Sequence, residues 1–232
     1  MNKNTPFQSI TPPLEYDKFS INNNTYKTYH IEQKTTKVNK TFNTKKKDII
    51  YIDYNDKLLW SFYTIINNDF ESFNTNHFKT EQDFKLKNVD LIEKNPDLLK
   101  PLKLQKHDIQ HDLFHSKKIN LDTLRALCVY NNISLIYVTG KKYYNLGNNE
   151  PEHIILDENN CVGVYINASA IKLLYYTNNY FLIENFKKPI KSLSGYSYDD
   201  LKNICIKINI QTTLANKKKT KKDLYEEILR II

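Results

Sequence analysis

The stretch IIYIDYNDKLLWSFYTIIN, residues 49–67, decides the fold. Its first five residues, IIYID, form a short β-like run, which predicts a strand. Asn55 and Asp56 then give a helix-start signal, and the apolar residues that follow recur at helical spacing. These apolar residues are Leu58, Leu59, Phe62, Ile65 and Ile66. A helix over 55–67 that is apolar on much of its surface has to be buried, so we expect it at the centre of the protein.

Further helices and strands are expected downstream of this unit. Thr80 and Asp83 resemble a capping box, which predicts a helix beginning at Thr80; two more helices are predicted over 106–115 and from Asn120. Residues 172–184 are interpreted as another hairpin. Four short runs predict strands: 133–138, 142–144, 153–156 and 161–166. The fold class is therefore predicted to be α+β, with four to six mainly antiparallel strands and two to four helices packed around the central one.

Two flanking segments differ from this core domain, 48–186. Residues 1–47 are polar without a regular apolar period, and we interpret them as an extended N-terminal arm with a short hairpin around Tyr26–Ile31. Residues 187–232 predict a module of two short amphipathic helices, 198–207 and 221–231. Their expected N-caps are Ser197 and Thr220, and their expected contacts are Leu201, Ile204, Leu224 and Ile228. The linker is short, so we expect the module to dock on the core.

Composition excludes several classes of protein. The chain has 232 residues, a formal net charge of +8 and 40% hydrophobic residues, enough for a packed core. No apolar run approaches the roughly 18–20 residues that cross a bilayer, and the N-terminus has no apolar signal-peptide core. Cys128, Cys161 and Cys205 are too widely spaced for a disulfide framework, which indicates a reducing compartment. Asn, Lys, Ile and Tyr are abundant and Arg is nearly absent, so we attribute much of the basic charge to AT-rich codons.

Three residues are candidates for a hydrolytic site. Ser61 lies early on the central helix, His153 at a strand edge and Cys161 at a strand start, so a serine or cysteine nucleophile with His153 as base is one hypothesis. The alternative is a core serine and a strand-edge histidine, because Trp60 and Phe62 flank Ser61 and no glycine surrounds it. No complete catalytic set emerges. We therefore expect a protein that is not an enzyme and needs no cofactor.

Histidines along one predicted helix are candidates for a metal site. His107, His111 and His115 are spaced i, i+4, i+8, and a pair such as His107 and His111 can share a metal ion. The third lies about 12 Å along the helix axis from the first, too far for one tetrahedral site. A solvated, histidine-rich helix face explains the same spacing, so we assign no metal.

The densest basic cluster lies in the C-terminal module, at Lys217, Lys218, Lys219, Lys221 and Lys222. A phosphate there could meet both the lysines and the N–H groups at a helix start, although a solvated charge run would look the same. The stretches DLKNICIKINI and KKTKKDLYEEIL resemble SAP-type and Rho-terminator N-terminal-type modules. This resemblance implies binding to nucleic acid or docking on a protein.

Residues 49–186 resemble an uncharacterised protein family of nucleocytoplasmic large DNA viruses, through Asn55–Tyr63, Phe78–Lys100 and Leu121–Val138. They are also distantly similar to papain-like, ovarian-tumour (OTU) type cysteine proteases. That resemblance puts Lys57 at the nucleophile position and Cys161 nearest the histidine position, so it implies a papain-like scaffold without the catalytic residues.

The function we expect is that of a non-enzymatic structural or assembly protein of a large DNA virus, carried in the virion or associated with a minor capsid component. It would be found in the virion, and in the host cytoplasm or virus factory during assembly. Its partners would be other virion proteins, with DNA or RNA contacted through the C-terminal module. Two alternatives stay open: a cysteine- or serine-type hydrolase, such as a protease or deubiquitinase, and a regulatory protein that binds nucleic acid.

Overall fold

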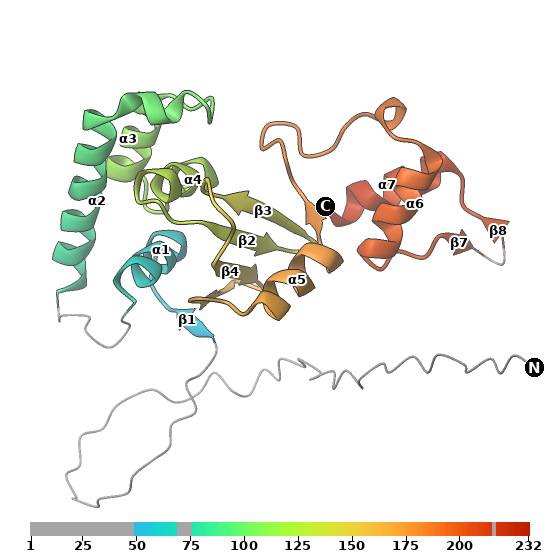
Figure 1. Ribbon diagram of the computed structural model, residues 1–232, viewed down its shortest axis with the longest axis horizontal. Helices are drawn as coiled ribbons and strands as arrows, with labels where there is room; N and C mark the ends of the chain where they lie inside the picture. Colours follow the sequence, from blue (N-terminus) through green and yellow to red (C-terminus); the bar gives the residue numbers. More distant parts are fainter. Residues whose placement is uncertain (1–48, 69–75, 215–216) are drawn as a thin grey trace, which may run out of the picture. The chain divides into compact units, whose positions relative to one another are not determined.

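The computed structural model describes residues 49–68, 76–214 and 217–232. At its centre is a six-stranded mixed sheet (Figure 1). The strand order is β1-β5-β4-β2-β3-β6. The pairings β1–β5, β4–β5 and β2–β3 are antiparallel, and β2–β4 and β3–β6 are parallel. The predicted α+β class with a mainly antiparallel sheet is confirmed. The strands are β1 Ile50–Ile52, β2 Leu135–Thr139, β3 Lys142–Leu146, β4 His153–Glu158, β5 Cys161–Tyr165 and β6 Phe181–Leu182.

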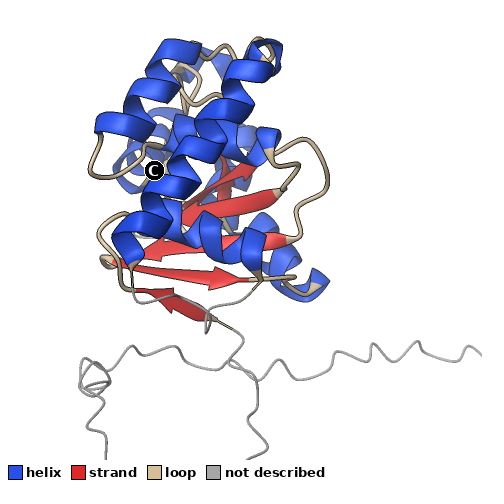
Figure 2. Cartoon of the chain, turned by 90° about the vertical axis from the view of Figure 1, so that its left-hand side faces the viewer, coloured by secondary structure: helices blue, strands red, loops and turns tan. Residues whose placement is uncertain are grey.

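Helices cover both faces of this sheet (Figure 2). Side chains alternate along each strand, so Leu135 and Tyr137 of β2 join the core cluster that contains α1, α2, α3 and α4. Ile136 and Val138 join the cluster on the opposite face, beneath α5. These helices are α1 Lys57–Asn67, α2 His77–Lys94, α3 Lys106–His115, α4 Leu121–Tyr130 and α5 Ala170–Asn179, with short 3-10 helices η1 at Pro96–Leu99 and η2 at Leu193–Gly195. None of the described helices is long and apolar enough to span a membrane.

Helix α1 is buried in the middle of the larger cluster, as its sequence predicts. Leu59 and Phe62 are almost completely shielded from solvent. Asp56 is the N-cap: one carboxylate oxygen accepts a hydrogen bond from the Leu59 amide at 3.1 Å. The other accepts from the Ile119 amide at 2.8 Å, which ties the start of α1 to the connection between α3 and α4.

Two predicted elements are wrong in detail. Helix α2 begins at His77 rather than after Thr80, because the Asn76 side chain accepts from the Lys79 amide at 3.1 Å and so supplies the cap. Residues 172–184 do not form a hairpin. Helix α5 occupies most of this stretch and only β6 follows it. Tyr176 of α5 and Tyr180 directly after it both pack into the cluster beneath α5. A spacing of four residues puts two side chains on one face of a strand or of a helix, so the spacing alone does not separate the two.

The C-terminal module contains α6 Tyr198–Lys207 and α7 Lys221–Ile231, as predicted, and a small ladder of β7 Thr213–Leu214 with β8 Lys217–Lys218 that sequence analysis missed. Leu201, Cys205, Ile208, Leu224 and Ile228 form its core. The module contacts the β3–β6 edge of the sheet: the Lys142 amine donates to the Ile232 carbonyl at 2.6 Å. The predicted arm 1–47, including the hairpin around Tyr26–Ile31, lies outside the described residues.

Candidate functional site

Ser61 is not placed where a nucleophile would be useful. It is completely buried within α1, and its hydroxyl donates to the Lys57 carbonyl at 2.6 Å, one helical turn back. A hydroxyl that is buried and already engaged in this way cannot reach a substrate without opening the core. The alternative that sequence analysis left open, a serine packed in the core, describes what the structure shows.

His153 and Cys161 lie at opposite ends of the β4–β5 hairpin. His153 begins β4, whereas Cys161 begins β5 and pairs with Glu158 at the far end of β4. Five residues of extended strand separate the two ends, a distance of about 16 Å. The structure therefore does not bring Ser61, His153 and Cys161 into one catalytic site.

The protonation of His153 should affect stability rather than catalysis. Its Nδ1 accepts a hydrogen bond from the Asn167 amide at 3.1 Å, so this nitrogen is unprotonated, and burial lowers the pKa of the imidazole below its ordinary 6.5. The unfolded chain takes up a proton at this residue near pH 6.5 and the folded chain only at lower pH, so the free energy of unfolding should fall as pH drops through 6.5. Urea unfolding between pH 7.5 and 5.5 checks this. His153→Gln, which does not titrate, should show a shallower loss, and equal losses would contradict the prediction.

Lys57 lies at the N-terminus of α1, against the turn between β4 and β5. Its amine donates to the carbonyl of Asn160, the residue before Cys161. The Lys57 side chain thus reaches the residue next to Cys161, although 103 residues separate Lys57 from Asn160. Lysine and cysteine at these positions do not provide a thiolate–imidazole pair.

The histidines of α3 form an exposed row. The rings of His107 and His111 lie 6.1 Å apart between centroids, and those of His111 and His115 lie 4.8 Å apart. Within the described ranges, no group of three or more His, Cys, Asp or Glu side chains is placed to hold a metal ion.

Charge is distributed unevenly along the chain. Residues 187–232 hold eleven Lys and Arg against five Asp and Glu, a net charge of +6. Residues 1–47 hold nine against three, also +6, whereas residues 48–186 hold fourteen against eighteen, a net charge of −4. Codon bias alone would raise lysine everywhere, so it does not explain an acidic core flanked by basic segments. The module and residues 1–47 are therefore the basic parts of the chain.

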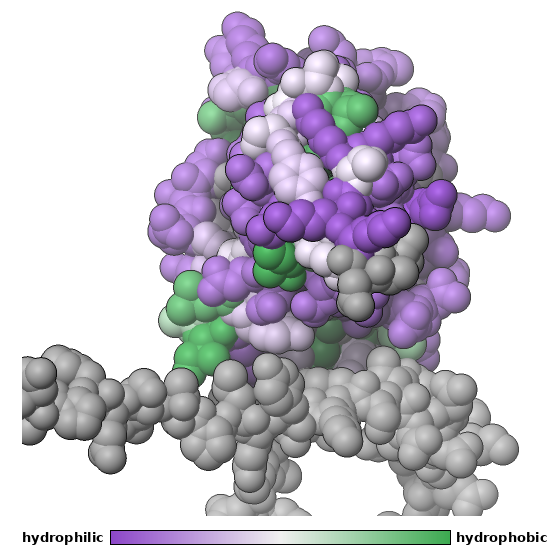
Figure 3. Space-filling view, turned by 90° about the vertical axis from the view of Figure 1, so that its right-hand side faces the viewer, coloured by the Kyte–Doolittle hydropathy of each residue, from purple (hydrophilic) through white to green (hydrophobic). Residues whose placement is uncertain are grey.

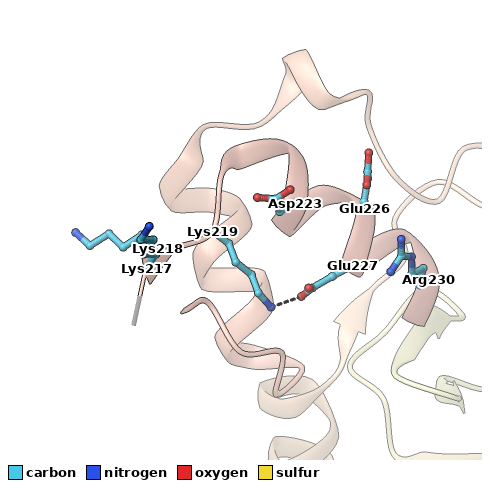
Figure 4. Close-up of a pocket in the computed structure, with 7 residues that line it drawn as sticks. All are labelled: Lys217, Lys218, Lys219, Asp223, Glu226, Glu227 and Arg230. Atoms are coloured by element: carbon cyan, nitrogen blue, oxygen red, sulfur yellow. Dashed lines mark hydrogen bonds and ion pairs between the residues drawn. The ribbon is translucent and has the colours of Figure 1, made fainter. Parts of the chain in front are cut away.

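A groove of about 440 Å³ lies in the module between β8 and α7 (Figure 4). Figure 3 shows the side of the molecule on which the module lies, and most of that face is hydrophilic. Four cations and three carboxylates line the groove: Lys217, Lys218, Lys219, Arg230, Asp223, Glu226 and Glu227. Sequence analysis missed Arg230. Its signal was available, because residues 223, 226, 227 and 230 recur at the spacing of one helix face.

Lys219 differs from the other lysines of the predicted cluster. Its amine donates to the Gln211 carbonyl at 2.6 Å and to the Glu227 carboxylate at 2.7 Å, and its side chain is only 9% exposed. Lys217 and Lys218, in contrast, are exposed and form no ion pair with any described residue. Lys219 is therefore held within the module's own structure, whereas Lys217 and Lys218 of the predicted cluster remain exposed.

Replacing Lys219 should consequently destabilise the protein. Lys219→Gln removes the ion pair with Glu227 and shortens the side chain, and we expect the free energy of unfolding to fall by about 1–2 kcal/mol. Lys217→Gln, two residues away and exposed, should change it by less than about 0.5 kcal/mol. Chemical denaturation followed by circular dichroism measures both. Equal effects of the two variants would show that the Lys219 contacts contribute nothing.

The start of α7 is closed by its own capping box. The Thr220 hydroxyl oxygen accepts from the Asp223 amide at 3.2 Å, and the Asp223 carboxylate accepts from the Thr220 amide at 2.9 Å. The Thr220 hydroxyl also donates to the Asp223 carboxylate at 2.7 Å. This bond and the bond from the Thr220 amide lower the pKa of Asp223, so a carboxylate stands where sequence analysis placed a phosphate on open N–H groups. The helix terminus is thus occupied by Asp223, and only the lysine side chains of this surface would be free to contact a phosphate.

Comparison of the chain with protein-family models, with curated proteins and with solved structures gives no match.

Proposed function

We propose that the protein is a non-enzymatic structural protein that binds the phosphate backbone of nucleic acid through its C-terminal module. The observation that carries this proposal is the separation of charge: the module has a net charge of +6 beside a core of −4. Lys217 and Lys218 are exposed on β8, and Lys221 and Lys222 begin α7, so four lysines lie on a short stretch of surface. Lysines contact phosphates as point charges, so the binding should be largely independent of sequence.

The core supports this proposal as a scaffold. In the core, Ser61 is buried, and His153 and Cys161 lie at opposite ends of the β4–β5 hairpin. The Lys57 amine is hydrogen-bonded to the turn of this hairpin. These placements favour a binding role over the hydrolase alternative. The module contacts the sheet edge through Ile232 and Phe181, so the core lies directly beside the part of the chain that carries the four lysines.

The salt dependence of binding tests the proposal. We expect the full chain to bind a 20-base-pair DNA duplex with a slope of log affinity against log salt of roughly −2 to −4, because each phosphate contact contributes about 0.9. Changing Lys217, Lys218, Lys221 and Lys222 to Gln should weaken binding roughly 100-fold near 0.1 M salt and flatten the slope. Lys219 stays unchanged in this variant, so the fold is preserved. Fluorescence anisotropy measures both quantities, and an RNA duplex of the same sequence provides the comparison.

A matched control separates the site from overall charge. Lys79, Lys87, Lys117 and Lys118 are exposed lysines of the core. Changing these four to Gln removes the same net charge and should leave the affinity within about two-fold. Equal weakening by the two sets of substitutions, or no binding at low salt, would overturn the proposal.

We also propose that the protein is a component of a large DNA virus particle, assembled in the host cytoplasm beside other virion proteins. The AT-rich composition and the resemblance over residues 49–186 support this source. Mass spectrometry of purified particles, compared with extract of infected cells, tests it. Enrichment in particles is expected, and depletion from them would contradict the proposal.

A further inference from the structure

The module contains two capping boxes with the same geometry. At α6, the Ser197 hydroxyl accepts from the Asp200 amide at 3.0 Å, and the Asp200 carboxylate accepts from the Ser197 amide at 2.8 Å. At α7, Thr220 and Asp223 make the equivalent pair of bonds. Both hydroxyl residues are exposed. Ser197 and Thr220 are therefore both exposed hydroxyl residues at the N-cap of a helix.

The residues near Ser197 and those near Thr220 carry opposite charge. Lys217, Lys218 and Lys219 precede Thr220, and Lys221 and Lys222 follow it directly, whereas Asp199 and Asp200 follow Ser197. The backbone that leads into Thr220 is extended, with β8 at Lys217–Lys218 and φ −71°, ψ 164° at Thr220 itself. An exposed threonine that follows an extended basic segment fits an acidic kinase groove, because kinases select substrates by complementary charge.

We propose that Thr220 is a phosphorylation site and that its phosphorylation releases the module from nucleic acid. The second half of this inference rests on the proposed function. In the reaction, Thr220 Oγ1 attacks the γ-phosphorus of ATP, a new O–P bond forms and the β–γ phosphoanhydride bond breaks. The hydroxyl proton passes to the catalytic carboxylate of the kinase, and ADP leaves.

The phosphate would act by local electrostatics. Residues 217–223 carry five lysines and Asp223, a net charge of +4. A phosphothreonine adds about −1.5 to −2 at pH 7 and brings three strong acceptor oxygens among these lysines. It also removes the hydrogen bond of 2.7 Å that the Thr220 hydroxyl donates to the Asp223 carboxylate. About half of the positive charge that would meet a nucleic acid is then neutralised within the chain.

The first experiment tests whether Thr220 is phosphorylated. The purified full chain is incubated with magnesium, ATP and protein kinase C, a kinase that prefers basic flanks, and the modified residues are quantified by mass spectrometry. We expect near-stoichiometric phosphate on Thr220 and little on Ser197. Thr220→Asn keeps an N-cap acceptor but cannot be phosphorylated, so it should lose this signal. Ser197→Asn, the matched change at the other cap, should retain it. Phosphate on Ser197 or elsewhere in preference to Thr220 would overturn the site.

The second experiment tests whether phosphorylation of Thr220 weakens binding to nucleic acid. Binding of the phosphorylated chain to the 20-base-pair duplex should be at least roughly ten-fold weaker near 0.1 M salt, with a slope shallower by about 1.8, the contribution of two contacts. Kinase-treated Thr220→Asn should bind as before treatment. Unchanged affinity of the Thr220-phosphorylated chain overturns the release. If the untreated chain fails to bind, the proposed function fails, while the mass spectrum still decides whether Thr220 is modified.

Discussion

Replacing Asp56 by alanine should lower the free energy of unfolding by about 3 kcal/mol. The Asp56 carboxylate is 1% exposed and accepts two backbone hydrogen bonds, from Leu59 inside α1 and from Ile119 before α4. Alanine removes the helix cap, which costs about 1 kcal/mol, and leaves the buried Ile119 amide without an acceptor, which costs about 1–3 kcal/mol more. The loss should be large because one side chain fixes the central helix to its neighbours.

Asp56→Asn is the control for this prediction. Its amide oxygen can still accept from Leu59, but its NH₂ group cannot accept from Ile119, so we expect an intermediate loss. Burial raises the pKa of Asp56, which means that the folded state favours the protonated carboxyl. The advantage of aspartate over asparagine should therefore be greatest below the ordinary pKa of 3.8 and decline as pH rises through the folded pKa. Urea unfolding of the three proteins from pH 3 to 7 measures this. Equal stability of Asp56→Ala and wild type would contradict the role of the carboxylate.

The elements that sequence analysis predicts well are those with both a cap and a periodic apolar face. Asp56, Asn120, Ser197 and Thr220 each accept from a backbone amide at a helix start. These signals are local, so the sequence alone contains them. The central position of α1 also follows locally, because a helix with so much apolar surface has to be covered on most sides.

The features that sequence analysis missed depend on distant contacts. Residues 172–184 combine tyrosines and leucines that suit a strand or a helix, and packing beneath the sheet selects α5. The parallel pairing of β2 with β4 joins strands that are not consecutive. In the candidate site, the role of Lys219 depends on Gln211 and Glu227, each eight residues away, so composition could not separate it from Lys217 and Lys218.

Replacing Gly147, in the connection between β3 and β4, by alanine should lower the free energy of unfolding by about 4 kcal/mol. Gly147 has φ +103°, a conformation that L-residues rarely adopt. A Cβ atom there would lie 2.3 Å from the Ile133 carbonyl oxygen and 2.8 Å from the Ser134 Cα, and both are backbone atoms. The strained backbone costs about 1–2 kcal/mol, and the overpacking about 1–3 kcal/mol more.

Gly140→Ala separates these two costs. Gly140 also has a positive φ, +58°, but a Cβ atom there would meet nothing within 4 Å. We therefore expect its replacement to cost only about 1 kcal/mol, the conformational part alone. Denaturant unfolding of both variants measures the difference, and equal losses would refute the steric argument.

Gly147 also matters for the sheet, because the Ser134 carbonyl beside it accepts a hydrogen bond from the Glu152 amide at 3.0 Å. Displacing Ser134 should loosen the parallel pairing of β4 with β2 at its first residues, where His153 lies opposite Leu135.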